Sequence, residues 1–241
     1  MQKPDILYIV KNDDDNEELR YSLRSLRNLP HGKVFISGYT PKWVDTDNVI
    51  SIDSYQGNGV YGFLNARSNL QHAMMTEKLS EDFVLMNDDF FIMKPIKSVP
   101  NLYGGMFIDM IDALAALNSK TTYLLGARAS AALLNETGLT ISDIKNYSIH
   151  TPMLMNKMLL YEVLMTSYSS NHAKMHLHIR TLYGNTHDIG GAEIKDIKVT
   201  GVTKEAFEGK MFLSTTDNSF KNGAVGTYVR NQLYGKGEYE L

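Results

Sequence analysis

Cysteine is absent from the 241-residue sequence, which excludes disulfide bonds and thiolate zinc sites. Long apolar runs are missing as well. The run at residues 6–10 is far shorter than a signal-peptide core, and no stretch approaches the ~20 apolar residues of a membrane span. We therefore expect a soluble, cytoplasmic protein with no membrane span. Because the formal net charge is −3, only a local basic face is left for binding nucleic acid.

The composition is that of an ordinary globular protein. Apolar residues make up 43% of the chain and charged residues 21%, so a core of normal size closes without disulfides or metals. The length suits one large domain. We predict a single domain over residues 1–241, with residues 223–241 as a partly flexible tail because they are rich in glycine and tyrosine.

Strand and helix patterns alternate along the first part of the chain. Apolar runs predict buried strands, and leucines at helical spacing predict helices between them. Strand–helix–strand units favour parallel strands with right-handed crossovers. The fold class is therefore α/β, with a mostly parallel sheet and helices on both faces. The expected strands are 6–10, 33–37, 49–52, 82–86, 121–126 and 212–216, and the expected helices are 16–29, 64–79, 110–118, 129–135 and 154–167.

An acidic turn follows the strand predicted at residues 82–86. It consists of Asn87, Asp88 and Asp89 and is flanked by apolar and aromatic residues, so its polar groups would be costly to bury without a partner. Hard divalent cations take carboxylate oxygens and leave positions for phosphate oxygens. Ligands of α/β sheets also bind at the ends of strands. We therefore predict a Mg²⁺ or Mn²⁺ site at Asp88 and Asp89, with a solvated turn as the alternative.

Two arginines and a histidine are further candidates. Arg20 and Arg24 are four residues apart, so they share one face of the predicted helix, and guanidinium groups suit phosphate oxygens. The alternative is a solvated face on which they pair with Glu17 and Glu18. His150 precedes a Thr-Pro bend and titrates in the range that acid–base chemistry needs, although a structural histidine is the alternative.

Other polar candidates lie later in the chain, with one tryptophan near its beginning. His172, Lys174 and Arg180 belong to a basic stretch that we expect to touch an anionic acceptor, whereas zinc is disfavoured there because no carboxylate is near. Asp217 follows a predicted strand, so it is either a second carboxylate at the same sheet edge or part of a plain turn. Trp43 is either a core residue or a platform for a sugar ring.

Several motifs occur in an order that is familiar from one family. They are DILY at 5–8, ELRYSLRS at 18–25, PKW at 41–43, FVLMNDDFF at 83–91, HTP at 150–152 with a helix after it, and LSTTDNSF at 213–220. In this order they resemble the four conserved blocks of the Stealth proteins. That family includes bacterial capsular polysaccharide phosphotransferases and the lysosomal N-acetylglucosamine-1-phosphotransferase.

The resemblance implies a GT-A-like fold, a three-layer α/β sandwich that binds a nucleotide-diphosphosugar donor. Matched position by position, it points to Arg20, Asp88, Asp89, His150 and Asp217. We expect the two neighbouring aspartates to hold the metal on the diphosphate. Arg20 would offset phosphate charge, and His150 or Asp217 would act as the base for the acceptor hydroxyl.

We expect the donor, with UDP as its nucleotide, to bind over the strand ends. The residues predicted to bind it are Tyr8, Val10, Asn12, Arg20, Arg24 and Asn87, and those predicted to bind the acceptor are Trp43, His172, Lys174 and Arg180.

Three functions compete at this point. The first is a transferase that moves a sugar or a sugar-1-phosphate to a polysaccharide. The second is a compact, phage-type glycosyltransferase that modifies hydroxymethylated pyrimidines in DNA, which the short chain and the basic stretch motivate. The third is a sugar-binding module without catalytic activity.

Overall fold

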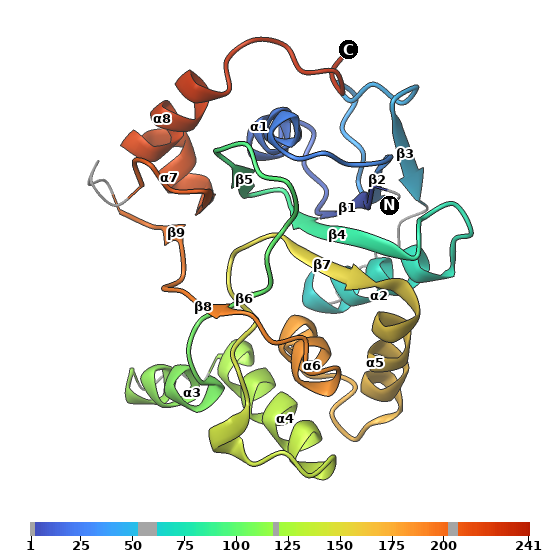
Figure 1. The fold of residues 1–241 in the computed structure, drawn as a ribbon, viewed down its shortest axis with the longest axis vertical. Helices are drawn as coiled ribbons and strands as arrows, with labels where there is room; N and C mark the ends of the chain where they lie inside the picture. The colour runs from blue at the N-terminus through green and yellow to red at the C-terminus, as the bar shows by residue number, and fades with distance from the viewer. Residues whose placement is uncertain (1–2, 53–61, 118–120, 202–206) are drawn as a thin grey trace. The chain divides into compact units, whose positions relative to one another are not determined.

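A computed structural model describes residues 3–52, 62–117, 121–201 and 207–241 of the chain (Figure 1). The chain divides into two compact units, and each is described by itself. Unit 1 comprises Met1–Val99, His150–Met155 and Ile197–Leu241, and unit 2 comprises Pro100–Ile149 and Asn156–Asp196. The single catalytic domain over residues 1–241 stays a prediction.

The main sheet of unit 1 has the strand order β3-β2-β1-β4-β7. β1 is parallel to both β2 and β4, and β2 is parallel to β3. The central strands are almost fully buried, as expected of apolar runs in a parallel sheet that is covered on both faces. The strands are β1 (Asp5–Val10), β2 (Val34–Gly38), β3 (Val49–Ile52), β4 (Asp82–Asn87) and β7 (Met153–Asn156).

Helices α1 (Glu17–Ser25) and α2 (Gly62–Met75) cover opposite faces of this sheet. The Tyr8 hydroxyl lies 3.0 Å from Ser22 Oγ of α1, whereas Ser37 Oγ donates to the Asn69 carbonyl of α2 at 2.9 Å. The register pairs Ser37 with Ile9, the neighbour of Tyr8, and successive residues of a strand point to opposite faces. A helix–sheet–helix layering follows, and the predicted α/β class with a mostly parallel sheet is confirmed.

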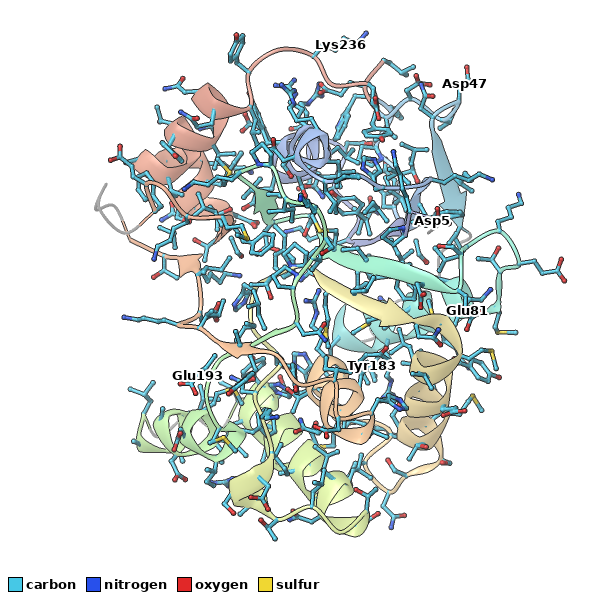
Figure 2. The ribbon with its side chains drawn as sticks, in the orientation of Figure 1. Asp5, Asp47, Glu81, Tyr183, Glu193 and Lys236 are labelled. Carbon is cyan, nitrogen blue, oxygen red and sulfur yellow. The ribbon has the colours of Figure 1, made fainter. Side chains whose placement is uncertain are left out.

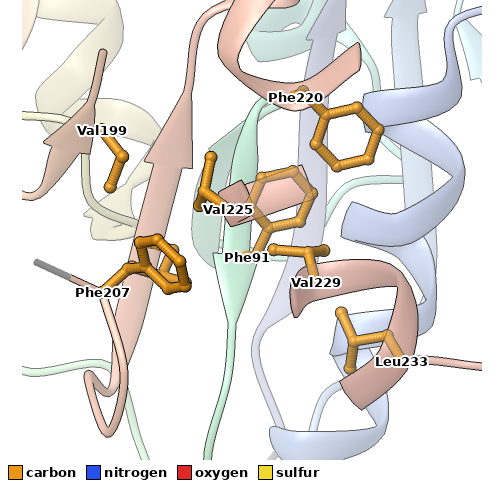
Figure 3. Packing of buried hydrophobic residues seen from close by; sticks show 8 residues of the cluster. Phe91, Val199, Phe207, Phe220, Val225, Val229 and Leu233 are labelled. Carbon is orange, nitrogen blue, oxygen red and sulfur yellow. The ribbon is translucent and has the colours of Figure 1, made fainter. Parts of the chain in front are cut away.

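A smaller sheet of order β5-β10-β9 completes unit 1. Its apolar side chains form a buried cluster with helices α7 and α8, in which the rings of Phe91 and Phe220 stack with centroids 5.5 Å apart (Figure 3). This cluster fixes β10 and α7 beside β5, which directly follows the acidic turn. The elements are β5 (Phe90–Ile92), β9 (Lys198–Val199), β10 (Phe212–Thr215), α7 (Asp217–Asn222) and α8 (Ala224–Gln232).

The described residues of unit 2 are mainly helical and include a small parallel sheet. Helix α3 packs against α4, α5 packs against α6, and α4 and α6 pack against each other. The described residues include two short 3₁₀ helices, Leu26–Asn28 after α1 and Ile141–Asp143 in unit 2. The elements of unit 2 are β6 (Leu102–Tyr103), β8 (Ala192–Glu193), α3 (Phe107–Ala116), α4 (Thr122–Glu136), α5 (Lys157–Ser169) and α6 (Ile179–Thr186).

Several details of the predicted elements are wrong. The helix expected at 64–79 ends at Met75, and the one expected at 129–135 begins at Thr122. Residue 118, the last of the helix expected at 110–118, lies outside the described residues. The strand expected at 121–126 is the first part of α4, whose N-terminus is capped by Thr121 and whose buried residues recur at helical spacing. The helix expected from residue 154 begins at Lys157, because Met153–Asn156 forms β7.

The sequence predicts a partly flexible tail at 223–241, whereas the structure places α8 there. Beyond α8, Tyr239 and Glu240 are buried. In the part of the chain that the structure describes, none of the helices combines the length and the apolarity of a membrane crossing.

Candidate active site

An acidic pocket of about 460 Å³ lies in unit 1, at the carboxyl ends of β1 and β4. The ends of parallel strands are where α/β proteins bind ligands. Its walls come from the residue after β1, the start of α1, the turn after β4, and β9 and β10 with the start of α7. The lining residues are Lys11, Glu18, Asp88, Asp89, Lys198, Thr215, Thr216, Asp217 and Asn218.

Asp88 is held by the residue that caps helix α1. The Asn16 side chain accepts a hydrogen bond from the backbone N–H of Leu19 at 3.0 Å, as N-cap residues do. Its Nδ2 donates to Asp88 Oδ2 at 2.9 Å. Burial raises the pKa of Asp88, and the neighbouring charge of Asp89 adds to the rise, whereas the hydrogen bond from Asn16 opposes it. The carboxylate therefore gains from any cation that enters the pocket.

Asp89 accepts two hydrogen bonds at the same oxygen. Lys198 Nζ lies 3.1 Å from Asp89 Oδ2, and Ser214 Oγ donates to that atom at 2.9 Å. The side chain of Asp89 is 14% exposed, so this ion pair is largely shielded from water. Both donors therefore converge on Oδ2 of this carboxylate.

Glu18 is a third carboxylate of the pocket. It is buried, and Thr215 Oγ1 donates a hydrogen bond to it. Burial raises its pKa to about 7, and the negative charges of Asp89, Asp88 and Asp217 contribute to the rise. The sequence suggests an exposed helix-start acid here, but the structure makes it part of the pocket wall.

Asp217 is the fourth carboxylate, and it stands at the first position of α7. Lys11 Nζ pairs with it at 3.2 Å, with side chains 57% and 65% exposed, so solvent screens this pair. Burial raises the pKa of Asp217, but the hydrogen bond and charge of Lys11, together with Glu18 and Lys221, outweigh burial and the pKa is lowered. The structure thus brings Asp217 to the pocket of Asp88 and Asp89, and its catalytic role stays a prediction.

The donor set of the pocket fits a cation that is shared with a substrate. Within the described residues, no three His, Asp or Glu side chains converge on one metal position. Mg²⁺, however, is typically held by one or two carboxylates together with waters and substrate phosphates. The pocket has four carboxylates and two ammonium groups, a formal excess of two negative charges. Adjacent Asp88 and Asp89 therefore suit Mg²⁺ or Mn²⁺, and the metal stays a prediction.

Arg20 and Arg24 do share one helical face, but they bind a carboxylate from far along the chain. Arg24 donates to Glu240 through Nε at 2.6 Å and Nη2 at 2.8 Å, and Arg20 Nη1 donates to Glu240 at 3.0 Å. The guanidinium of Arg20 also stacks on Trp43, 4.3 Å from the ring centroid. Neither arginine lines the acidic pocket. The alternative pairing of these arginines with Glu17 and Glu18 is not observed either, since Glu17 pairs with Arg230 and Glu18 accepts from Thr215.

The other residues predicted to bind the donor have different surroundings. Tyr8 and Val10 are buried in the core. Asn12 is exposed next to the pocket residue Lys11, and Asn87 is the half-buried last residue of β4. His150 packs edge-on against Phe90, which follows Asp89, with ring centroids 6.3 Å apart. His150 therefore lies near the acidic turn without lining the pocket.

The predicted acceptor residues fall into both units. Trp43 belongs to unit 1, where its Nε1 donates to the Asp14 carbonyl at 3.1 Å. His172, Lys174 and Arg180 belong to unit 2, where Lys174 is exposed and the other two are half-buried. Their contact with an acceptor stays a prediction.

Four residues of the candidate site were not predicted from the sequence. Lys11, Glu18 and Lys198 line the pocket, and Asn16 orients Asp88. A signal existed for Asn16, because an asparagine before the first helical turn is a typical cap. No local signal existed for Lys198, whose approach to Asp89 depends on strand pairing across more than a hundred residues.

Fold and site together define an α/β protein with an acidic pocket at the ends of its parallel strands. No protein-family model matches the chain. The chain is 35% identical over 92 residues to the N-acetylglucosamine-1-phosphotransferase subunits alpha/beta of Mus musculus, which covers 34% of this chain and 7% of that protein. It is 26% identical over 165 residues to an exopolysaccharide phosphotransferase of Streptomyces coelicolor, which covers 62% of this chain and 17% of that protein.

These similarities confirm the resemblance to sugar-phosphate transferases that the motifs indicate. The chain corresponds to less than a fifth of the length of either relative. Among solved structures, the WbbM bifunctional glycosyltransferase has a TM-score of 0.40 and 9% identity, covering 96% of this chain and 45% of its own. Mouse xyloside xylosyltransferase 1 has a TM-score of 0.40 and 10% identity, covering 98% of this chain and 96% of its own. The related proteins are transferases.

Proposed function

We propose that this chain is a metal-dependent transferase with a GT-A-like fold. It would move a sugar or a sugar-1-phosphate from a nucleotide-diphosphosugar, with UDP as the expected nucleotide, to a hydroxyl of a polysaccharide. The observation that carries the proposal is the pocket at the ends of β1 and β4, where Asp88 and Asp89 stand side by side among two further carboxylates. The similarity to two phosphotransferases supports the same class of reaction.

Each part of the pocket has a chemical role in this proposal. Asp88 and Asp89 hold Mg²⁺ or Mn²⁺, which would neutralise charge on the donor diphosphate. Asn16 keeps Asp88 oriented, and Lys11 offers a cation to phosphate oxygens at the pocket mouth. His150, beside Phe90, is the candidate base for the acceptor hydroxyl, and Asp217 is the second candidate.

Donor turnover with Mn²⁺ tests the proposal through the nucleotide that is released. Mass spectrometry would find UMP if the sugar is transferred together with its phosphate, and UDP if the sugar alone is transferred. Asp89→Asn should lower turnover by about 10²-fold or more, because several kcal/mol of charge stabilisation are lost with the metal. The control is Asp47→Asn, an equal charge change at an exposed aspartate of unit 1 that is labelled in Figure 2.

Release of neither nucleotide, or an Asp89→Asn protein with undiminished metal-dependent turnover, would overturn the proposed function.

A further inference from the structure

Lys198 pairs with Asp89, and its place beside Asp89 is set by the pairing of two strands. The pairing of β9 with β10 places Lys198 opposite Ser214, so the two side chains leave neighbouring strands side by side. Both then reach Asp89 Oδ2, at 3.1 and 2.9 Å. Ser219 Oγ also holds β9 in place by donating to the Val199 carbonyl at 2.7 Å.

This ammonium group competes with the cation of the proposed function for one carboxylate. Two cations on the same carboxylate repel each other, and the repulsion is weakly screened because the Asp89 side chain is only 14% exposed. The side chain of Lys198 is 27% exposed at the pocket wall and has a flexible four-carbon stem. It therefore has room to turn from Asp89 towards an anion in the same pocket.

A nucleoside diphosphate offers Lys198 such an anion. When the diphosphate enters together with the cation, the ammonium group exchanges the carboxylate for a phosphate oxygen, and Asp89 becomes available to the metal. Without the diphosphate the same movement leaves Lys198 without its counter-ion, so the metal alone binds weakly.

We propose that Lys198 is an exchangeable counter-ion that pairs with Asp89 in the absence of donor and with the donor diphosphate in the metal-bound complex. The inference depends on the proposed function, because it assumes a cation and a nucleoside diphosphate in this pocket. Its consequence is thermodynamic coupling: the diphosphate must tighten metal binding, and the metal must tighten diphosphate binding by the same factor.

The other lysine of the pocket is placed differently. Lys11 pairs with Asp217 and not with Asp89, and more than half of each side chain is exposed. Solvent therefore screens its effect on a metal at Asp89.

Removing the charge of Lys198 should change the two affinities in opposite directions. Without nucleotide, Lys198→Gln should bind Mn²⁺ about 5-fold more tightly than the wild type, because a competitor for Asp89 is lost. With saturating Mn²⁺, the same variant should bind UDP about 10-fold more weakly, because a charge-assisted contact is lost. Free Mn²⁺ is measured by electron paramagnetic resonance and UDP binding by calorimetry.

Matched variants make these results interpretable. Lys198→Arg keeps the charge and should keep both affinities within about 3-fold of the wild type. Lys210→Gln removes a charge from an exposed lysine before β10 and should leave both unchanged. Circular dichroism and thermal unfolding establish that each variant is folded, and Lys198→Met replaces Lys198→Gln if the latter is not.

The counter-ion role is overturned if the affinities of Lys198→Gln for Mn²⁺ and for UDP both shift in the same direction. Loss of a purely structural ion pair would have that effect. It is also overturned if neither affinity changes. In that case the proposed function stands as long as the wild type binds Mn²⁺ and UDP and Asp89→Asn abolishes the Mn²⁺ binding. A folded wild type that binds neither ligand overturns both proposals.

Discussion

Glu18 has surroundings that differ from those its position in the sequence suggests. It stands at the start of a helix, where an acidic side chain usually interacts with the helix dipole from an exposed position. Here the side chain is buried and shares a pocket with three aspartates, and its pKa is raised to about 7. Near neutral pH, Glu18 therefore exchanges its proton inside the pocket.

This raised pKa predicts a pH dependence of stability with a definite sign. From the ordinary value of 4.5 up to about 7, folded Glu18 keeps a proton that the unfolded chain has released. The contribution of Glu18 to the free energy of unfolding must therefore fall as the pH rises through that interval. In EDTA, the wild-type free energy minus that of Glu18→Gln should fall by about 2 kcal/mol from pH 5 to pH 8, as measured by urea unfolding.

The neighbouring Glu17 is the control for that measurement. The hydrogen bonds from Arg230 lower its pKa, with burial acting against them, so its stabilising contribution is lost only as the pH falls below about its ordinary value. Glu17→Gln should thus show a constant difference from the wild type between pH 5 and pH 8. A constant difference for Glu18→Gln as well would show that its carboxyl titrates normally in the fold.

At the scale of elements, the segment at residues 237–241 is a small structure of its own. Its residue Glu240 forms an isolated bridge with Val44, and the backbone N–H of Leu241 donates to the Trp43 carbonyl at 2.9 Å. The Glu240 side chain is 2% exposed and receives hydrogen bonds from two arginines of α1 and from the Gly237 backbone. A single carboxylate therefore joins this segment to the first helix.

Removing that charge should loosen the segment and lower stability. Glu240→Gln should decrease the free energy of unfolding by about 2 kcal/mol at pH 7, because it leaves two arginines with a neutral partner. Burial raises the pKa of Glu240, but the hydrogen bond from Arg24 and its other partners outweigh burial and the pKa is lowered. This stabilisation is therefore present above the ordinary value of 4.5 and is lost as the pH falls below it.

Trp43 is the single tryptophan of the chain, and its backbone is bonded to this segment, so its fluorescence follows the unfolding. Glu238→Gln, an equal charge change at an exposed position two residues away, is the comparison. Equal stability of the two variants would contradict the prediction.

The elements that sequence patterns predicted well are short, mostly apolar strands, of which β1, β2 and β4 are buried along most of their length. β1 to β4 are apolar runs between polar turns, and their expected bounds agree with the structure within one or two residues. The segment 121–126 was wrongly predicted as a strand, because its apolar residues are too few to show a period of 3.6 before a glycine interrupts them. The tertiary structure requires a glycine at position 126, where α4 closely approaches another backbone. A Cβ there would lie 1.8 Å from the His176 carbonyl oxygen.

At the scale of the whole molecule, the pocket joins segments that are far apart in the chain. The ends of β1 and β4 and the start of α1 were predictable as neighbours, because the order of a parallel α/β sheet brings strand ends together. The contributions of β9, β10 and α7 were not, since they depend on the antiparallel pairing of β10 with β5. Asp217 was a candidate because it follows a predicted strand, whereas Lys198 has only two residues of strand around it.

Because the pocket residues come from segments throughout unit 1, we expect a ligand bound there to stabilise unit 1 as a whole. A ligand that binds only the folded state at a hundred times its dissociation constant adds about 2.7 kcal/mol to stability. For a chain of this size, this corresponds to a rise of about 5 °C or more in the melting temperature. Mn²⁺ and UDP together should produce such a rise in the wild type and in Asp47→Asn. Asp89→Asn should lose most of it, because an uncharged amide replaces the carboxylate that we propose as a ligand of the metal. Differential scanning fluorimetry measures the shift, and an equal shift in Asp89→Asn would place the nucleotide outside the acidic pocket.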